Sequence, residues 1–304
     1  MNEQTLQKLA RPIIVLATLI WGSSFVVMKD TVNVLPTFYL LAIRFSAAAV
    51  ILAAVFWKRW RVLDRQYLLG GGVMGLCLFV AYAFQTFGLE RTTSGKNAFL
   101  TAVYCVIVPF LYWAIARKRP DKFNLLAALL CIAGIGLVSL TTQSSGGLTM
   151  GLGDGLTLIG GFFFACHIVA VSRFSEGRDI FILTALQFAS FALLSWACAL
   201  LFAQPLPLEV FTPDLLWKLA YLVVFASCGA LLFQNIGQKY TPPATAAVLL
   251  SLEAPFGVLF SILFADERPT GLMFLGFALI FVAVVCSETK FEFLRKKTSA
   301  PAQK

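Results

Sequence analysis

The amino-acid sequence predicts an all-α polytopic membrane protein whose ten transmembrane helices form two inverted five-helix repeats. Three observations predict this fold class: the composition, the number of long apolar segments, and an internal repeat. Of the 304 residues, 59% are hydrophobic and 13% are charged, whereas a soluble domain has about 45–50% apolar and about 25% charged residues. This composition excludes a soluble enzyme, a disordered chain and a secreted disulfide-rich domain.

Ten segments are long and apolar enough to span a bilayer, since a spanning helix needs about 20 mostly apolar residues. Their approximate bounds are 12–30, 37–57, 67–89, 97–116, 123–141, 153–172, 180–202, 215–236, 244–265 and 270–288. The first segment follows Lys8 and Arg11 and could imitate a signal peptide. It lacks a small-residue cleavage site, and nine further segments follow it, so we expect it to be the first transmembrane helix.

The basic residues between the spans predict the orientation of the chain. With the N-terminus inside, the inner segments carry 18 Lys and Arg residues and the outer segments carry 5. Because basic residues concentrate in cytoplasmic loops, we expect a multi-pass protein of the cytoplasmic membrane with both termini in the cytoplasm. The net charge of +9 therefore indicates topology, and no nucleic-acid partner is expected.

The two halves of the sequence resemble each other. Phe84-Gln85-x-x-Gly88-x-x-x-Thr92 recurs in the second half as Phe233-Gln234-x-x-Gly237-x-x-x-Thr241, and the second span matches the seventh when Phe38 is aligned with Phe181. Each half holds five spans, an odd number, so the two halves must be inverted in the membrane. Inverted repeats are typical of transporters that work by alternating access, with a solute site near the bilayer midplane.

These boundaries divide the chain into four parts. We expect a cytoplasmic N-terminal tail at residues 1–11, a first repeat at 12–145, a second repeat at 150–288, and a basic cytoplasmic tail at 289–304.

The chain also resembles the EamA-type branch of the drug/metabolite transporter superfamily over about residues 12–288. The residues that carry the resemblance are Trp21-Gly22-Ser23-Ser24-Phe25, Arg44, Leu252-Glu253-Ala254-Pro255 and Asp266-Glu267-Arg268-Pro269. The resemblance implies a ten-helix basket in which helices 1–4 and 6–9 surround a central cavity and helices 5 and 10 are peripheral. It also implies transport of amino acids, other metabolites, sugars or drugs, commonly outward. Ala254 separates the acidic residue from the proline, which departs from many relatives.

Metal, cofactor and enzyme sites are not expected. The chain has one histidine, His167, and its seven cysteines are dispersed through apolar runs, whereas a structural zinc site needs about four closely spaced ligands. Residues 70–75 match G-x-G-x-x-G in letters, but they lie in an apolar helix with no preceding strand, so we reject a nucleotide site. No nucleophile and base are arranged for catalysis.

Arg44 and Glu253 are ionisable residues inside predicted spans, where charge is costly unless it faces a cavity or a partner. Two roles remain open for them. They could form a buried ion pair that fixes packing or gates one face. Alternatively, Arg44 could hold a substrate carboxylate, which its planar guanidinium suits, while Glu253 holds an amine or a proton.

His167 lies in the middle of the sixth span and aligns with Ser24 at the same spacing that aligns Phe181 with Phe38. Trp21 and Ser24 share one helix face, so His167 and Trp21 could shape one site. A proton-coupling role is open to His167 because imidazole titrates near neutral pH, as is a purely structural bond to a neighbouring carbonyl.

Further polar residues are candidates for lining the cavity, with bonding between helices as the alternative for Gln85 and Gln234. They are Tyr82, Gln85, Asn97, Tyr104 and Gln234. Pro109 and Pro255 lie in the fourth and ninth spans and predict equivalent kinks that could act as hinges, or merely packing kinks. Small-residue spacings leave a monomer and a homodimer both open.

The predicted function is secondary active or facilitative transport of a small organic metabolite, an amino acid or a related compound, with export as the favoured direction. Transport of a drug, sugar or other metabolite, including proton-coupled uptake, is the alternative. A non-transporting membrane sensor or scaffold is a more remote one.

Overall fold

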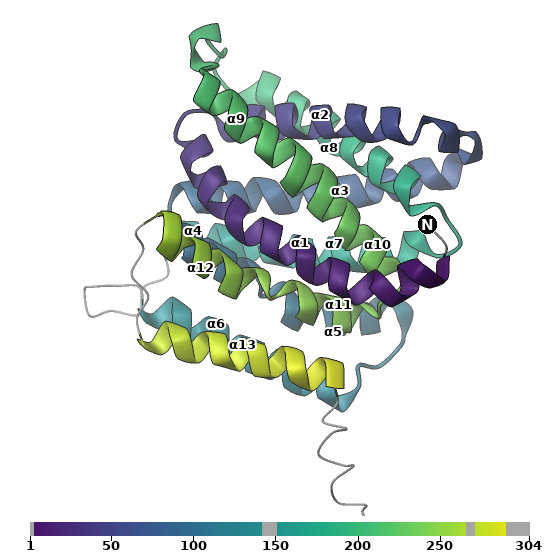
Figure 1. Cartoon of the computed structure of the whole chain (residues 1–304), viewed down its shortest axis with the longest axis vertical. Helices are drawn as coiled ribbons and strands as arrows, with labels where there is room; N and C mark the ends of the chain where they lie inside the picture. Colours follow the sequence, from purple (N-terminus) through teal and green to yellow (C-terminus); the bar gives the residue numbers. More distant parts are fainter. Residues whose placement is uncertain (1–2, 142–150, 266–270, 290–304) are drawn as a thin grey trace, which may run out of the picture.

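The computed structural model describes residues 3–141, 151–265 and 271–289. Its described part consists of helices joined by short loops (Figure 1). Eight segments are long and apolar enough to cross a membrane: Gln4–Val32, Thr37–Val55, Arg65–Glu90, Ser94–Ala116, Leu152–Ser175, Ile180–Phe202, Pro213–Lys239 and Pro243–Phe264. Together with the apolar helices α6 (Lys122–Thr141) and α13 (Gly271–Thr289), they agree with the ten predicted spans. The predicted C-terminal tail and the junction between the repeats lie largely outside the described residues.

The first repeat begins with three long helices. They are α1 (Glu3–Val32), α2 (Thr37–Val55) and α3 (Arg65–Glu90), with the short 3-10 turn η1 (Trp57–Val62) between the last two. The side chain of Asp64 caps α3 by accepting a bond from Tyr67 N at 2.9 Å. The fourth span is broken into α4 (Ser94–Thr101) and α5 (Tyr104–Ala116).

The second repeat has the same order of elements. Its helices are α7 (Leu152–Ser175), α8 (Ile180–Phe202), α9 (Pro213–Tyr221), α10 (Ala230–Lys239), α11 (Pro243–Leu250) and α12 (Glu253–Phe264), with a short 3-10 turn, η2 (Leu208–Val210), before α9. A π-helical stretch, η3 (Leu222–Gly229), joins α9 to α10. The resulting span, Pro213–Lys239, has 27 residues, whereas its equivalent Arg65–Glu90 has 26. The extra residue thus coincides with a π-type insertion.

The fourth and ninth spans break at equivalent positions. Helices α4 and α11 each have 8 residues, and in both spans the next helix begins after a two-residue gap, at Tyr104 and at Glu253. At each break the backbone makes shorter i to i+3 bonds, such as Val103 N to Leu100 O at 3.2 Å and Leu252 N to Leu249 O at 3.2 Å. Broken helices of this kind expose backbone near the midplane of many transporters.

The structure corrects the predicted equivalence of the two prolines. Pro109 is the sixth residue of α5, whereas Pro255 is the third residue of α12. Because Tyr104 and Glu253 are equivalent first residues of these helices, the two prolines are out of register. Pro255 removes the backbone donor that would bond Ser251 O in the break before α12, whereas the corresponding residue for Pro109 is Cys105, inside α5. A hinge role for either remains a prediction.

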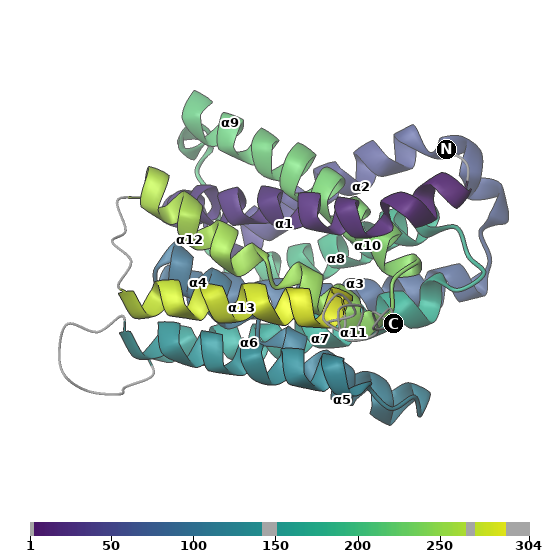
Figure 2. The same cartoon turned by 60° about the horizontal axis from the view of Figure 1, so that its bottom comes forward.

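The helices are arranged around a buried centre. Helices α6 and α13 pack against each other at one edge of the molecule (Figures 1 and 2), which matches the peripheral placement expected for the fifth and tenth spans. At the centre, Phe45 on α2 and Phe188 on α8 form an edge-to-face pair with ring centroids 5.4 Å apart. These two residues occupy equivalent places in the two repeats, since each is the ninth residue of its helix.

Candidate functional site

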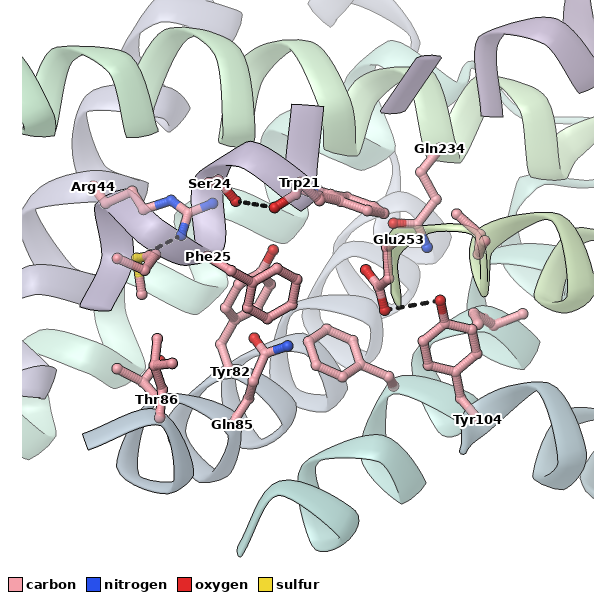
Figure 3. A pocket seen from close by; sticks show the side chains of 15 residues that line it. Trp21, Ser24, Phe25, Arg44, Tyr82, Gln85, Thr86, Tyr104, Gln234 and Glu253 are labelled. Carbon is pink, nitrogen blue, oxygen red and sulfur yellow. Dashed lines mark hydrogen bonds between the residues drawn. The ribbon is translucent and has the colours of Figure 1, made fainter. Parts of the chain in front are cut away.

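A central cavity of about 40 Å³ lies between the two repeats (Figure 3). It is lined by Trp21, Ser24, Phe25, Met28, Arg44, Tyr82, Gln85, Thr86, Leu89, Tyr104, Phe164, Ile168, Gln234, Leu250 and Glu253. This volume holds a few water molecules, so a larger solute requires the helices or side chains to move apart.

Arg44 reaches the cavity from α2 and is 1% exposed. Its Nε donates to Ser227 Oγ at 2.5 Å, and its Nη1 donates to Met28 Sδ at 3.4 Å. The guanidinium carbon lies 5.1 Å from the centre of the Tyr82 ring, a cation–π arrangement. Among the described residues, Nη2 has no hydrogen-bond partner, so a buried donor of a permanent cation is left available.

Glu253 is the first residue of α12, directly after the helix break. Tyr104, the first residue of α5, donates from its hydroxyl to Glu253 Oε1 at 2.9 Å. The bond joins the equivalent break points of the two repeats. The duplicated helix break therefore positions both side chains at the centre of the molecule.

The structure does not form the ion pair that was one of the two alternatives for Arg44 and Glu253. The two side chains lie at opposite ends of the cavity, with Tyr82 and Gln85 between them (Figure 3). Within the described chain, each charge is held by neutral groups: Arg44 by Ser227 and Met28, and Glu253 by Tyr104.

Eight of the ten predicted cavity residues line this one cavity. On α1, the indole Nε1 of Trp21 donates to Ala226 O at 2.9 Å, and Ser24 Oγ donates to Trp21 O at 2.9 Å. On α3, Gln85 Nε2 donates to Thr101 Oγ1 at 3.0 Å. Gln234 lies at the equivalent position on α10 and lines the same cavity.

The structure corrects the prediction for Asn97 and His167, which do not line the cavity. Asn97 Nδ2 on α4 donates to Thr157 Oγ1 on α7 at 2.8 Å and to Gln85 O on α3 at 3.1 Å. His167 Nε2 lies 3.2 Å from Gln187 Oε1 on α8. Both side chains are fully buried and bond to neighbouring helices; for His167, the alternative that we stated was a structural bond to a neighbouring carbonyl.

Sequence reasoning missed a buried ion pair between the repeats. Lys96 Nζ on α4 lies 2.7 Å from Asp154 Oδ2 on α7, with side-chain exposures of 8% and 4%. The carboxylate also accepts from Gly151 N at 3.0 Å and from Thr92 Oγ1 at 3.3 Å. Both residues begin apolar spans at the same end of the bundle, and their opposite charges are a signal that could have indicated the pair.

Comparisons with known proteins agree with this architecture. A family model described as the EamA-like transporter family matches residues 10–140 and 151–289. A protein from Archaeoglobus fulgidus named "Uncharacterized transporter" is 31% identical over 277 residues, covering 89% of this chain and 82% of its own length. A second A. fulgidus protein of the same name is 28% identical over 303 residues, covering 95% of this chain and 99% of its own length.

A solved crystal structure shares the fold. It superposes with a TM-score of 0.75 at 17% identity and covers 93% of this chain and 98% of its own. The two family matches and the duplicated helices place the protein among multi-pass membrane transporters, and the chain belongs to the EamA-like transporter family.

Proposed function

We propose that this transporter moves a small zwitterionic metabolite, an amino acid or a close relative, across the cytoplasmic membrane by alternating access. The observation that carries the proposal is the placement of Arg44 and Glu253 on one cavity without an ion pair between them. A buried cation and a buried carboxyl group that face a shared space can bind a solute with the complementary pair of charges.

The Arg44 side of the cavity suits a carboxylate. The Nη2 atom of Arg44 is buried without a partner among the described residues. An unsatisfied buried donor is unfavourable unless a ligand or water meets it. A guanidinium binds carboxylates through planar, paired hydrogen bonds. Ser24 and Thr86 add neutral hydroxyl groups to the lining of the same cavity.

The Glu253 side suits an ammonium group. The Oε1 atom of Glu253 accepts a hydrogen bond from the Tyr104 hydroxyl, and Gln234 contributes an amide on the same side of the cavity (Figure 3). Trp21, Phe25 and Phe164 supply aromatic surface between the polar groups, which suits a partly apolar side chain. Outward transport is the direction that the family resemblance implies, and it forms part of this proposal.

A solute panel with purified protein tests the charge requirement. We expect an amino acid to raise the thermal unfolding temperature, because a ligand that binds the folded state stabilises it by mass action. The matched amine, which lacks the carboxylate, and the matched acid, which lacks the amine, should stabilise less. Equal stabilisation by all three, or stabilisation by sugars alone, would refute the zwitterion assignment.

Proton coupling is a second candidate, favoured by the position of Glu253. A carboxyl group that is 5% exposed and bonded to a neutral phenol can be neutralised by a solute ammonium or by a proton. Flux into proteoliposomes with and without a pH gradient distinguishes the two. Coupling predicts that a proton gradient drives accumulation and that Glu253→Gln removes this dependence, whereas gradient-independent flux excludes coupling.

A further inference from the structure

Three polar residues that line the cavity from the first repeat have equivalents in the second repeat. Ser24, Arg44 and Thr86, here called the first-repeat cluster, lie on α1, α2 and α3. In the alignment of the two repeats they correspond to His167, Gln187 and Asn235, here called the second-repeat cluster. The helix ends support this alignment, because the same spacings relate the ends of α1 and α7, the starts of α2 and α8, and the ends of α3 and α10.

The second-repeat cluster is connected and buried. Gln187 Oε1 accepts from His167 Nε2 at 3.2 Å and from Asn235 Nδ2 at 3.2 Å, and Asn235 Nδ2 also donates to Thr184 Oγ1 at 2.9 Å. His167, Gln187 and Asn235 are each 0% exposed. None of the three lines the central cavity.

Polar atoms in both clusters lack partners among the described residues. They are Arg44 Nη2 and Thr86 Oγ1 in the first repeat, and His167 Nδ1, Gln187 Nε2 and Asn235 Oδ1 in the second. Buried polar groups are normally satisfied, so each exception needs an explanation. In the first-repeat cluster, the cavity supplies the space for a partner. The second-repeat cluster has equivalent unsatisfied positions without that space.

Helix α3 packs closely on α8 beside Gln187 of the second-repeat cluster. A Cβ added at Gly71 would lie 2.4 Å from Leu186 Cβ, and one added at Gly75 would lie 2.7 Å from Gln187 O. The two glycines therefore allow α3 to contact the backbone beside Gln187. This is the structural role of the glycine run that we rejected as a nucleotide motif.

The inverted counterpart of this contact, in which the span Pro213–Lys239 approaches α2, has no glycine at the equivalent positions. When the starts of α3 and α9 are aligned, Gly71 and Gly75 correspond to Leu219 and Val223. Larger side chains keep helix axes farther apart, so the approach of this span to α2 is less close. This difference explains why the cavity extends to Arg44 and not to Gln187 in this state.

We infer that His167, Gln187 and Asn235 form a second polar subsite that lines the solute cavity when the transporter opens toward the opposite side. This inference rests on the proposed function, because inverted repeats exchange conformations during alternating access. In the exchanged state, α3 moves off α8, and the unsatisfied Nε2 donor of Gln187 meets the carboxylate that Arg44 holds in the present state, while the acceptors His167 Nδ1 and Asn235 Oδ1 meet hydrogen-bond donors of the solute or water.

The subsite has a consequence for release. Arg44 is a permanent cation, whereas Gln187 at the equivalent position is neutral. Hydrogen bonds to charged groups are stronger than those between neutral groups. An anionic group is therefore held more tightly in the state that exposes the first-repeat cluster and is released more readily from the state that exposes the second.

Side-specific thiol labelling in sealed vesicles tests the inference without knowledge of the solute. The seven native cysteines are replaced, and single cysteines are introduced as Thr86→Cys in the first-repeat cluster and Asn235→Cys in the second. A membrane-impermeant maleimide is applied from one side at a time. Ala185→Cys is the matched control, because it lies on α8 near Gln187 but packs into the apolar core.

We expect Thr86→Cys to react from one side and Asn235→Cys from the other, each at least about tenfold faster than Ala185→Cys, because labelling follows the population of the open state. Gln187→Cys provides a second position in the same cluster if Asn235→Cys does not fold. Reaction at Thr86→Cys with none at either second-repeat position overturns the subsite while leaving the transporter assignment intact. Absence of labelling at both clusters, together with absence of solute flux, overturns both.

Discussion

The first-repeat and second-repeat clusters occupy equivalent backbone positions but differ in charge and in access. Arg44 lines a cavity and holds a cation over an aromatic ring, whereas Gln187 is fully buried outside that cavity and bonds to His167 and Asn235. The duplicated helices thus provide equivalent backbone positions in both repeats, and substitutions at a few of these positions make the two clusters chemically different. A transporter with a preferred direction of binding and release requires such a difference.

The two ends of the bundle also close in different ways. The end where α4 and α7 begin is joined by the Lys96–Asp154 ion pair. Toward the other end, α3 packs onto α8 through Gly71 and Gly75. The ion pair can be broken by replacing the lysine, and the glycine contact can be broken by adding a single methyl group. The contact that closes each end of the bundle can therefore be tested separately.

The largest effect is expected from breaking the ion pair. Lys96→Met keeps the length of the side chain but leaves Asp154 buried without its cation, and removal of one partner of a buried pair costs about 3–5 kcal/mol. We expect a large drop in thermal unfolding temperature. Lys218→Met is the control, because the Lys218–Asp214 pair is solvent-exposed and such pairs contribute about 0–1 kcal/mol. Equal effects of the two substitutions would contradict the assignment of Lys96–Asp154 as a closure.

Removing the cation of the first-repeat cluster should weaken solute binding strongly. Arg44→Gln gives both clusters the same residue, and losing one partner of a buried charge pair costs about 2–5 kcal/mol, or about 30-fold or more in affinity. Titration with an amino acid measures the change, and Arg61→Gln, at an exposed arginine, is the control. Affinity within about twofold of the unmodified protein would exclude carboxylate binding by Arg44.

Neutralising the other end of the cavity should have a smaller and selective effect. Glu253→Gln preserves the size of the side chain and a bond to Tyr104, but it removes the charge that faces an ammonium group. We expect affinity for amino acids to fall about tenfold or more, since a hydrogen bond to a charged group contributes about 1.5–3 kcal/mol. The matched acid without an amine should lose less. Glu209→Gln, at an exposed position, is the control, and equal losses for both solutes would argue against ammonium binding.

The smallest effect on stability is expected at the glycine contact. Gly71→Ala forces a Cβ to within 2.4 Å of Leu186 Cβ, and overpacking costs about 1–3 kcal/mol. It should separate α3 from α8 and increase labelling of Asn235→Cys. Gly72→Ala is the matched control, since nothing lies within 4 Å of its added Cβ. No change in labelling by Gly71→Ala would show that this contact does not cover the second-repeat cluster.

The helices and their duplication could be predicted from sequence because a bilayer demands long apolar segments whose backbone bonds are internal. The break in the fourth span could not be located, because the residues around Val103 carry no glycine or proline signal. The break in the ninth span lies at Ser251 and Leu252, just before Pro255, whose missing N–H removes the backbone bond to the residue four positions earlier. Pro109 and Pro255 suggested equivalent kinks but lie within the following helices and out of register. Backbone geometry at the breaks depends on packing between the repeats, which periodicity does not reveal.

Most of the cavity residues could be predicted because polar groups inside spans are costly and few. The position of a polar residue within a span did not indicate whether its side chain faces the cavity or a neighbouring helix. Asn97 and Gln85 lie close together, yet only Gln85 lines the cavity. Lys96 and Asp154 lie near the starts of spans, and only the contact between α4 and α7 shows that they are buried together.

Exchange flux in proteoliposomes tests the central claim most directly. Vesicles that hold purified protein are loaded with an unlabelled amino acid and diluted into a trace of the same labelled amino acid. We predict transient accumulation of label, which the matched amine and the matched acid compete for weakly and which Arg44→Gln abolishes. Undiminished exchange in Arg44→Gln, or exchange of the amine and the acid as fast as the amino acid, would contradict a cavity built around the charge pair of Arg44 and Glu253.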